Sequence, residues 1–519
     1  MSSSYLWPCA ALCVALGNAA LAQSSTVFVG SSTSGSTDRH YLVNAASGTI
    51  LSGGSSGFTD NVTDAVWADY GQTLYVSSSI QNRINKAVWN GSSATWSLLY
   101  TAPAACYGLG HDRENQHLWV LVGSGSSELH CVDLDPASAN FGQRIAETTT
   151  LAGPLRERWE LAPNGRYAAV PYLLLQGGTL DLVDTDPSSA TFTQIVQSLP
   201  VPDASSMFSF AVDVCISRDS RWVWLMFTGT GYSRVSVLDM STLAWLDFNP
   251  SAPGEQSLQV LSTTGSSLSV SPDGLVAVAT SNSTAGQAVR IQIDPALPVN
   301  SVVTDYGATS GSLPRANGSS MSPTGDRASI AATPGNLVGP SYLVTLNSST
   351  GQVVSNVALP NIWNVYTSAW QAECPPPLSY CTGGTTSSGC VATLASSGVP
   401  SAGAQSGYTL TASSLEGAKQ GLIFYSITGR AAVAWGASTS FLCVKSPTQR
   451  TPAQLSGGTV GQCNGSLSID WNSYIAGAAS PLGAPFSPGT KVQAQAWFRD
   501  PPSPKTTMLS NALEFEVCP

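Results

Sequence analysis

A strand–turn–strand motif that recurs along most of the chain constrains the fold most strongly. Its clearest copy is Ser267–Thr280 (SLSVSPDGLVAVAT), where Pro272 presets φ for the turn and Asp273-Gly274 supply the turn itself. Short apolar alternations on both sides of this turn are typical of half-buried or buried strands. The motif therefore predicts a repeated β scaffold, and it identifies no ligand.

Five further copies of the motif precede or follow the reference copy. They are Ala65–Ser77, Gly108–Val122, Trp159–Tyr172, Val214–Phe227 and Ser320–Ala332. The turns lie about 50 residues apart, which is the length of a four-stranded propeller blade. Each copy is followed by two more strand-like segments, and no segment here holds a helical period for three turns.

The two ends of this region complete one more blade. Thr26–Gly30, His40–Asn44 and Gly48–Leu51 match the second, third and fourth strands of a unit, and Asn364–Trp370 supplies the missing first strand. Sharing a blade between the ends removes free sheet edges. We therefore predict a closed seven-bladed propeller over residues 23–372.

A second β-rich unit follows a stiff break. The linker 373–379 contains three consecutive prolines, Pro375–Pro377, which exclude a continuing strand. Beyond it, residues 380–519 carry apolar runs with Gly, Ser and Pro in the turns. The expected strands are Gly407–Ala412, Gly421–Ile427, Ala431–Trp435, Lys491–Phe498 and Ala512–Val517. A small β-sandwich is the natural interpretation, and the fold class is all-β.

Both units resemble known families. The repeats resemble the YVTN and WD40-like propellers of secreted bacterial proteins, chiefly through SPDG at 271–274 and SPTG at 322–325. The last 140 or so residues resemble a cysteine-rich C-terminal module of secreted bacterial proteins with unassigned function. That likeness is carried by GLIFYSITGRAA at 421–432, RTP at 450–452, AWFRDP at 496–501 and LSNALEFEVCP at 509–519. The resemblance implies a shared surface or export-related module, and it brings no activity.

Residues 1–22 are predicted to be a secretory signal. Leu6–Leu16 is an apolar run too short to span a bilayer, and Ala20-Leu21-Ala22 forms a small-x-small cleavage site. The segment lacks a basic residue before the apolar run, so a buried N-terminal strand is the alternative. No later stretch has the ~18 apolar residues of a membrane helix. We expect a protein that is secreted or held at the cell surface, cleaved near Ala22, without a membrane span.

Cysteine usage indicates disulfides in the second unit. Six cysteines fall in the last part of the chain: Cys374, Cys381, Cys390, Cys443, Cys463 and Cys518. In an exported chain this density predicts a disulfide framework, whose pairing the sequence leaves open. Cys106 and Cys131 belong to one predicted blade and are candidates for a further pair, and Cys215 is left as a buried thiol. Zinc is the weaker alternative, since that unit has no CxxC spacing and no histidine.

Charge and motifs exclude several functions. The net charge of −10 and the absence of a basic patch argue against nucleic acid as a partner. The sequence has no GxSxG elbow, Walker loop, HxH or HExxH pattern. His111 and His117 flank a turn and are expected to be solvated. We therefore expect no cofactor and no metal.

One set of charged residues is set apart by its position in the repeats. Alignment on the turns places Asp64, Arg158 and Asp213 at one height on innermost strands, and Glu160 shares the face of Arg158. Together they are candidates for a ligand or ion site at the channel mouth. The alternative is that Arg158 pairs with Asp213 or Glu160 to neutralise buried charge between blades.

The function predicted from these features is general. We expect a secreted or cell-surface, non-catalytic and monomeric binding protein with a small-molecule, glycan or protein ligand. One alternative is a propeller enzyme of the lactonase or quinone-dependent dehydrogenase type, which would need histidine, carboxylate and arginine side chains converging on the channel. The other is a structural surface-layer or adhesion protein.

Overall fold

The computed structural model describes most of the chain between residues 26 and 518. Outside the description lie 1–25, 32–39, 55–59, 124–126, 150, 152–157, 175–176, 204–209, 230, 253–255, 284–286, 307–314, 334–339, 361, 363–364, 371–373, 375–376, 437–438 and 519. The predicted signal peptide, with Cys9 and Cys13, and much of the predicted linker therefore lie outside the described residues.

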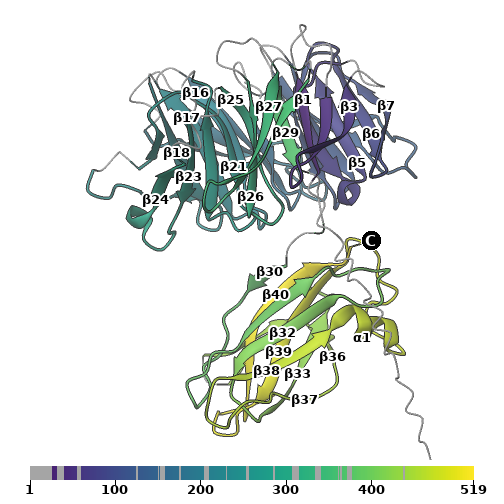
Figure 1. Ribbon diagram of the computed structural model, residues 1–519, viewed down its shortest axis with the longest axis vertical. Coiled ribbons are helices and arrows are strands. Elements are labelled where there is room, and N and C mark those ends of the chain that lie inside the picture. Colours follow the sequence, from purple (N-terminus) through teal and green to yellow (C-terminus); the bar gives the residue numbers. More distant parts are fainter. Residues whose placement is uncertain are drawn as a thin grey trace, which may run out of the picture.

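Strands β1 to β29 form seven antiparallel sheets, the blades of a propeller (Figure 1). Blade 1 is β29 (Val365–Trp370), β1 (Thr26–Ser31), β2 (His40–Asn44) and β3 (Thr49–Gly54). Blade 2 is β4 (Asp64–Ala68), β5 (Thr73–Ser78), β6 (Arg83–Trp89) and β7 (Ala94–Thr101), with the 3-10 turn η1 (Asp69–Gly71) after β4. Blade 3 is β8 (Cys106–Asp112), β9 (His117–Gly123), β10 (Ser127–Asp133) and β11 (Arg144–Glu147).

The remaining blades repeat this order from the channel outward. Blade 4 is β12 (Glu160–Leu161), β13 (Tyr167–Leu174), β14 (Gly177–Asp184) and β15 (Ile195–Pro200). Blade 5 is β16 (Phe210–Ile216), β17 (Trp222–Gly229), β18 (Tyr232–Asp239), β19 (Ala244–Trp245) and β20 (Leu258–Leu261). Blade 6 is β21 (Gly265–Val270), β22 (Val276–Ser281), β23 (Gln287–Gln292), η2 (Pro298–Asn300) and β24 (Val302–Asp305). Blade 7 is β25 (Ala316–Met321), β26 (Arg327–Ala332), β27 (Ser341–Asn347) and β28 (Val353–Leu359).

The predicted closure is confirmed. β1 pairs with β29 in antiparallel register, with Phe28 opposite Ala369 and Val29 opposite Ser368. The indole of Trp67 in blade 2 donates to the carbonyl of Ala369 at 3.1 Å, which ties the closing strand to the next blade. Both ends of the propeller region thus share blade 1.

Apolar cores lie between neighbouring blades. The core between blades 5 and 6 contains Trp222, Trp224 and Leu268, and six similar clusters join the other neighbouring blades around the ring. Trp224 is fully buried, and its indole donates to the carbonyl of Gly274 in the reference turn at 3.0 Å. Gly274 has φ +72°, and a Cβ there would lie 2.6 Å from side-chain atoms of Ser217 and Trp222, so the turn requires glycine.

The second unit is a sandwich around one core. One sheet joins β30 (Leu378–Tyr380), β40 (Thr507–Glu516), β39 (Lys491–Arg499), β33 (Gln420–Ser426), β36 (Gln449–Arg450) and β37 (Gln454–Leu455). The other joins β31 (Thr393–Gly398), β32 (Tyr408–Leu415) and β38 (Gly465–Asp470). A hairpin of β34 (Arg430–Ala434) and β35 (Phe441–Val444) packs on β39 and β40 of the first sheet. The short helix α1 (Trp471–Gly477) is capped by the Asp470 side chain, which accepts from the Ser473 amide. In the centre, Trp471 packs edge to face with both Tyr408 and Phe515.

The disulfide framework of this module is confirmed, and its pairing is now defined. Cys374 bonds Cys518, Cys381 bonds Cys443, and Cys390 bonds Cys463. The further pair Cys106–Cys131 was wrong, because both are buried free thiols. Cys106 is on β8 and Cys131 on β10, with β9 between them, and they belong to different inter-blade cores. Two strand spacings of about 4.8 Å separate them, which is too far for a disulfide.

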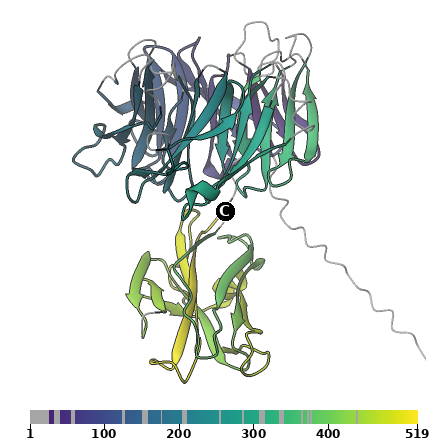
Figure 2. The same ribbon diagram turned by 90° about the vertical axis from the view of Figure 1, so that its left-hand side faces the viewer.

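The module lies against the face of the propeller that carries the strand–turn–strand turns (Figures 1 and 2). Tyr70 in the turn after β4 donates to the carboxylate of Glu516 at the end of β40, at 2.9 Å. A second link is the ion pair between Lys491 of the module and Glu114 of blade 3. Within the described residues, none of the helices has the length and apolar character that crossing a membrane requires.

Candidate functional site

The innermost strands of blades 5, 6 and 7 share an irregularity, and one predicted charged residue, Asp213, lies at it. In blades 5, 6 and 7 the pairing of the first two strands shifts by one residue just before Asp213, Ser267 and Gly318. A β-bulge of this kind turns the strand and re-aims the side chain that follows it. These are the positions that the repeat alignment places at one height in the channel.

Two of the four predicted residues link neighbouring blades. The Asp64 carboxylate accepts from the Leu109 amide of blade 3 at 2.8 Å, and the Asp213 carboxylate accepts from the Leu268 amide of blade 6 at 2.8 Å. Ser267 repeats the pattern without charge, since its hydroxyl oxygen accepts from the Ser319 amide of blade 7 at 2.8 Å. Asp64 and Asp213 therefore help to hold neighbouring blades together through hydrogen bonds, in addition to contributing charge.

Positive charge is scarce in this group. Arg158 Nη1 lies 4.0 Å from Asp213 Oδ1, a long ion pair in which the two side chains are 28% and 13% exposed. One guanidinium thus faces three carboxyls. Burial raises the pKa of Asp64 to about 6, and hydrogen bonds from Leu109 and Ala65 and the charge of Arg158 oppose that rise. Burial likewise raises the pKa of Asp213, against the charge of Arg158.

Glu160 is the least satisfied of the four. Burial raises the pKa of Glu160 well above its ordinary value, and repulsion from Asp64 and Asp213 adds to the rise. Among the residues that the structure describes, no hydrogen bond or ion pair reaches its carboxyl. All four predicted residues lie close enough to interact electrostatically, and none of the described residues forms an ion pair with Glu160.

A cavity of ≈1850 Å³ lies between the propeller and the module, and Glu160 is on its wall. Its propeller side includes Tyr70, Arg113 and Arg218, and its module side includes Arg430 and Glu514. Of the four predicted residues only Glu160 lines this cavity. This cavity therefore lies beside the turns of the repeat, at the end of the inner strands where the module is docked.

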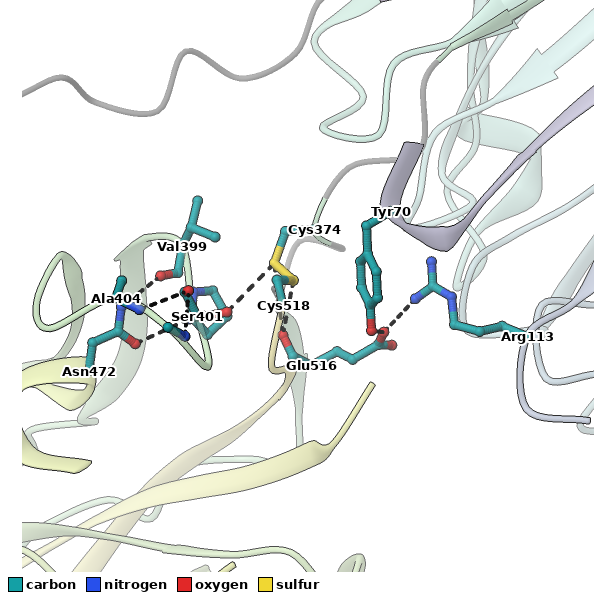
Figure 3. The surroundings of a disulfide bond; sticks show 11 residues. Tyr70, Arg113, Cys374, Val399, Ser401, Ala404, Asn472, Glu516 and Cys518 are labelled. Carbon is teal, nitrogen blue, oxygen red and sulfur yellow. Dashed lines mark hydrogen bonds and ion pairs between the residues drawn. A yellow bond between two sulfur atoms is a disulfide. The ribbon is translucent and has the colours of Figure 1, made fainter. Parts of the chain in front are cut away.

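On the module side of the cavity, the carboxylate of Glu516 contacts two side chains of the propeller, Tyr70 and Arg113. Arg113 forms an ion pair with Glu516, and its guanidinium lies 4.4 Å from the centre of the Tyr70 ring (Figure 3). The disulfide Cys374–Cys518 lies directly beside this contact. It joins the linker to the chain just beyond β40, close to the propeller.

The prediction for the turn histidines was wrong. His111 belongs to β8 and His117 begins β9, because the strands continue up to the turn, and both are half-buried. His111 also lines the cavity. Burial lowers the pKa of His111 to about 4, and the neighbouring charge of Arg113 adds to the effect. A neutral imidazole therefore stands on the wall at neutral pH.

Sequence reasoning did not find the cavity residues Tyr70, Arg113 and Glu516. They come from two separate units, and no pattern in the sequence shows which face of the propeller the module covers. The one usable signal is that the turns of the repeat all lie on one face, which makes turn residues such as Arg113 candidates for any partner docking there.

The chain matches no protein-family model and no curated protein sequence. Many solved structures are similar in part, and three of them serve as examples. Hydrazine synthase from Kuenenia stuttgartiensis is 15% identical, with a TM-score of 0.42 over 55% of this chain and 76% of that one. The Cps50 (Swd1) beta-propeller domain from Myceliophteria thermophila is 14% identical, with a TM-score of 0.43 over 58% and 87%. A functionally unknown protein from Desulfotomaculum acetoxidans is 11% identical, with a TM-score of 0.47 over 67% and 100%. At these values the likenesses carry no inference about function.

Proposed function

We propose that the protein is an exported, non-catalytic binding protein that takes a small organic cation in the cavity beside Glu160. The observation that carries this proposal is the Glu160 carboxyl, which lines the cavity and has no hydrogen bond or ion pair within the described residues. A partly buried carboxylate beside two others is costly without a counter-charge, and a ligand ammonium group would supply one. Asp64 and Asp213 add negative potential at the same place.

Export is supported by three independent features. Residues 1–22 have the pattern of a secretory signal, the repeats and the last 140 or so residues resemble secreted bacterial proteins, and the module holds three disulfides. We propose that residues 23–372 form the binding propeller and that residues 380–519, after the linker 373–379, close one end of its channel.

The experiment measures thermal stability in the presence of small cations. Tetramethylammonium, putrescine and spermidine chlorides are compared with sodium chloride at matched ionic strength. We expect at least one cation to raise the melting temperature of the propeller by several degrees, because a ligand that binds only the folded state stabilises it. Glu160→Gln should abolish that rise, while Asp294→Asn, the same change on a loop away from the cavity, should keep it.

If no cation distinguishes the wild type from Glu160→Gln, the proposal is wrong. The enzyme alternative has one feature in its favour, since His111 and Glu160 line the same cavity. It requires turnover of a lactone or an alcohol by the wild type that is lost in His111→Gln. Binding of a cation without turnover supports the binding protein over the enzyme.

A further inference from the structure

Blade 3 brings together a histidine and two glutamates away from the channel. Glu128 and His130 are two residues apart on β10 and so project from the same face of the sheet. Glu147 on β11 lies directly opposite His130 in the strand pairing. One potential ligand atom from each of the three residues lies within 4.8 Å of the others. We call Glu128, His130 and Glu147 the β10–β11 cluster.

The spacing within the cluster fits a transition-metal ion. His130 Nε2 lies 3.4 Å from Glu128 Oε2 and 3.8 Å from Glu147 Oε2. Zinc bonds of 2.0–2.2 Å in tetrahedral geometry place neighbouring donor atoms about 3.3–3.6 Å apart. Imidazole nitrogen with carboxylate oxygen is also a donor set that zinc accepts. The two distances from His130 are therefore within a few tenths of an ångström of this spacing, and the two glutamate oxygens lie within 4.8 Å of each other.

His130 is held in position for this role. Its side chain is fully buried, and its Nδ1 is hydrogen-bonded at 2.9 Å to the hydroxyl of Tyr100, which comes from blade 2. A hydrogen bond to the second ring nitrogen is the usual way in which proteins orient a metal-binding histidine.

A cation already stands at the cluster. Arg144 forms an ion pair with Glu147, and its Nη1 lies 3.4 Å from His130 Nε2. Its side chain is 40% exposed, so it can swing into solvent without opening a core. Arg144 therefore occupies the position that a metal ion would take, and it competes with the ion rather than assisting it.

From this geometry we infer a binding site for one zinc-class divalent transition ion, held by Glu128, His130 and Glu147, positioned by Tyr100 and opposed by Arg144. The site lies on the outer strands of blade 3 and is separate from the cavity beside Glu160. It replaces the expectation, drawn from the histidine pattern, that the propeller binds no metal.

The test is a zinc titration of the full chain by calorimetry after dialysis against a chelator. We expect one Zn²⁺ per chain for the wild type and about tenfold or more weaker binding for Glu128→Gln and Glu147→Gln. Arg144→Gln should bind Zn²⁺ more tightly than the wild type, because the competing charge is gone. Tyr100→Phe should weaken binding about tenfold as a positioning residue.

Glu114→Gln, an exposed glutamate at the module contact, is the matched control and should bind like the wild type. Two results would overturn the inference. One is the absence of stoichiometric zinc in both the wild type and Arg144→Gln. The other is zinc binding that Glu128→Gln and Glu147→Gln leave unchanged. Neither result bears on the cation site at Glu160, whose test uses other variants and other ligands.

Discussion

The propeller and the module solve the problem of a stable β fold in different ways. The propeller divides its interior into seven small cores between blades and closes the ring with one strand pairing. The module has one principal core and three disulfides, while the described propeller cysteines, Cys106, Cys131 and Cys215, are all free thiols. The larger unit relies on packing and closure, and the smaller one relies on covalent links, as expected from their sizes.

The largest expected effect is a difference in how the stability of the two units responds to reduction of the disulfides. Reducing agent should strongly destabilise the module, since each lost bridge costs ~2–5 kcal/mol, and leave the propeller almost unchanged. Calorimetry with and without reductant measures both transitions. In unfolded, unreduced protein cleaved after Ala22, thiol titration should find Cys106, Cys131 and Cys215 only. Free thiols at the six module positions would contradict the comparison and the export proposal together.

The second effect breaks the closure of the propeller. Val29 is fully buried in β1, between its partners Tyr41 and Ser368. Val29→Pro should destabilise the propeller by ~3 kcal/mol or more through lost ladder hydrogen bonds, and leave the module transition in place. Val354→Pro is the control, because Val354 is 39% exposed at an irregular position of the outer strand β28. If both variants lost the same propeller stability, the closing strand pair would contribute no more to stability than an outer strand does.

The third effect is an opposite response of two carboxyls to acid. The pKa of Asp64 is raised above its unfolded value, so its contribution to stability is full below about pH 4 and is lost as the pH rises through about 6. For Glu514 of the module, burial pushes the pKa upward, but hydrogen bonds from Arg430 and Gln493 outweigh it and the pKa is lowered. Its contribution is therefore present above the unfolded pKa and lost as the pH falls through the folded one.

The measurement compares variants because the pKa values of His111, His117 and His130 are lowered, so that these histidines destabilise the fold in acid and would mask Asp64. From pH 7.5 to pH 4, the stability of the wild-type propeller relative to Asp64→Asn should rise by at most ~3 kcal/mol. Over the same pH range, the stability of the wild-type module relative to that of the Glu514→Gln variant should fall. Parallel trends in the two units would contradict the assigned pKa directions.

The smallest expected effect concerns the contact between the units. Glu516→Gln removes the charge that binds Arg113 and weakens the contact with Tyr70, at a cost of ~1–3 kcal/mol in the coupling of the two transitions. Glu114→Gln should cost ~0–1 kcal/mol, because its ion pair with Lys491 is exposed on both sides. Small-angle scattering should show a more extended molecule for Glu516→Gln alone.

Local signals explain what could be predicted. Asp273-Gly274 and its equivalents specify turns by themselves, so the strands, their spacing and the closing strand 364–370 follow from the sequence. The repeat alignment also brought Asp64, Arg158, Glu160 and Asp213 to one region, since equivalent residues of a propeller lie at one height.

Features that depend on three-dimensional pairing could not be predicted. Cys106 and Cys131 share a blade, but the strand between them and the alternation of faces decide that they never meet. Glu147 lies opposite His130 only because β10 and β11 pair in one register. The docking of Glu516 on Tyr70 and Arg113 depends on two surfaces whose match no single stretch of sequence encodes.

The closing pair β1–β29 also has a kinetic consequence. β1 is made before every other strand of the propeller, while its partner Val365–Trp370 follows all of the other blades. Contacts so distant along the chain form late and slowly. Until then blade 1 has three strands and an open edge, which is a site for pairing with other chains. A chain threaded through a membrane pore in order would need its first strand kept from aggregating until the last blade has arrived.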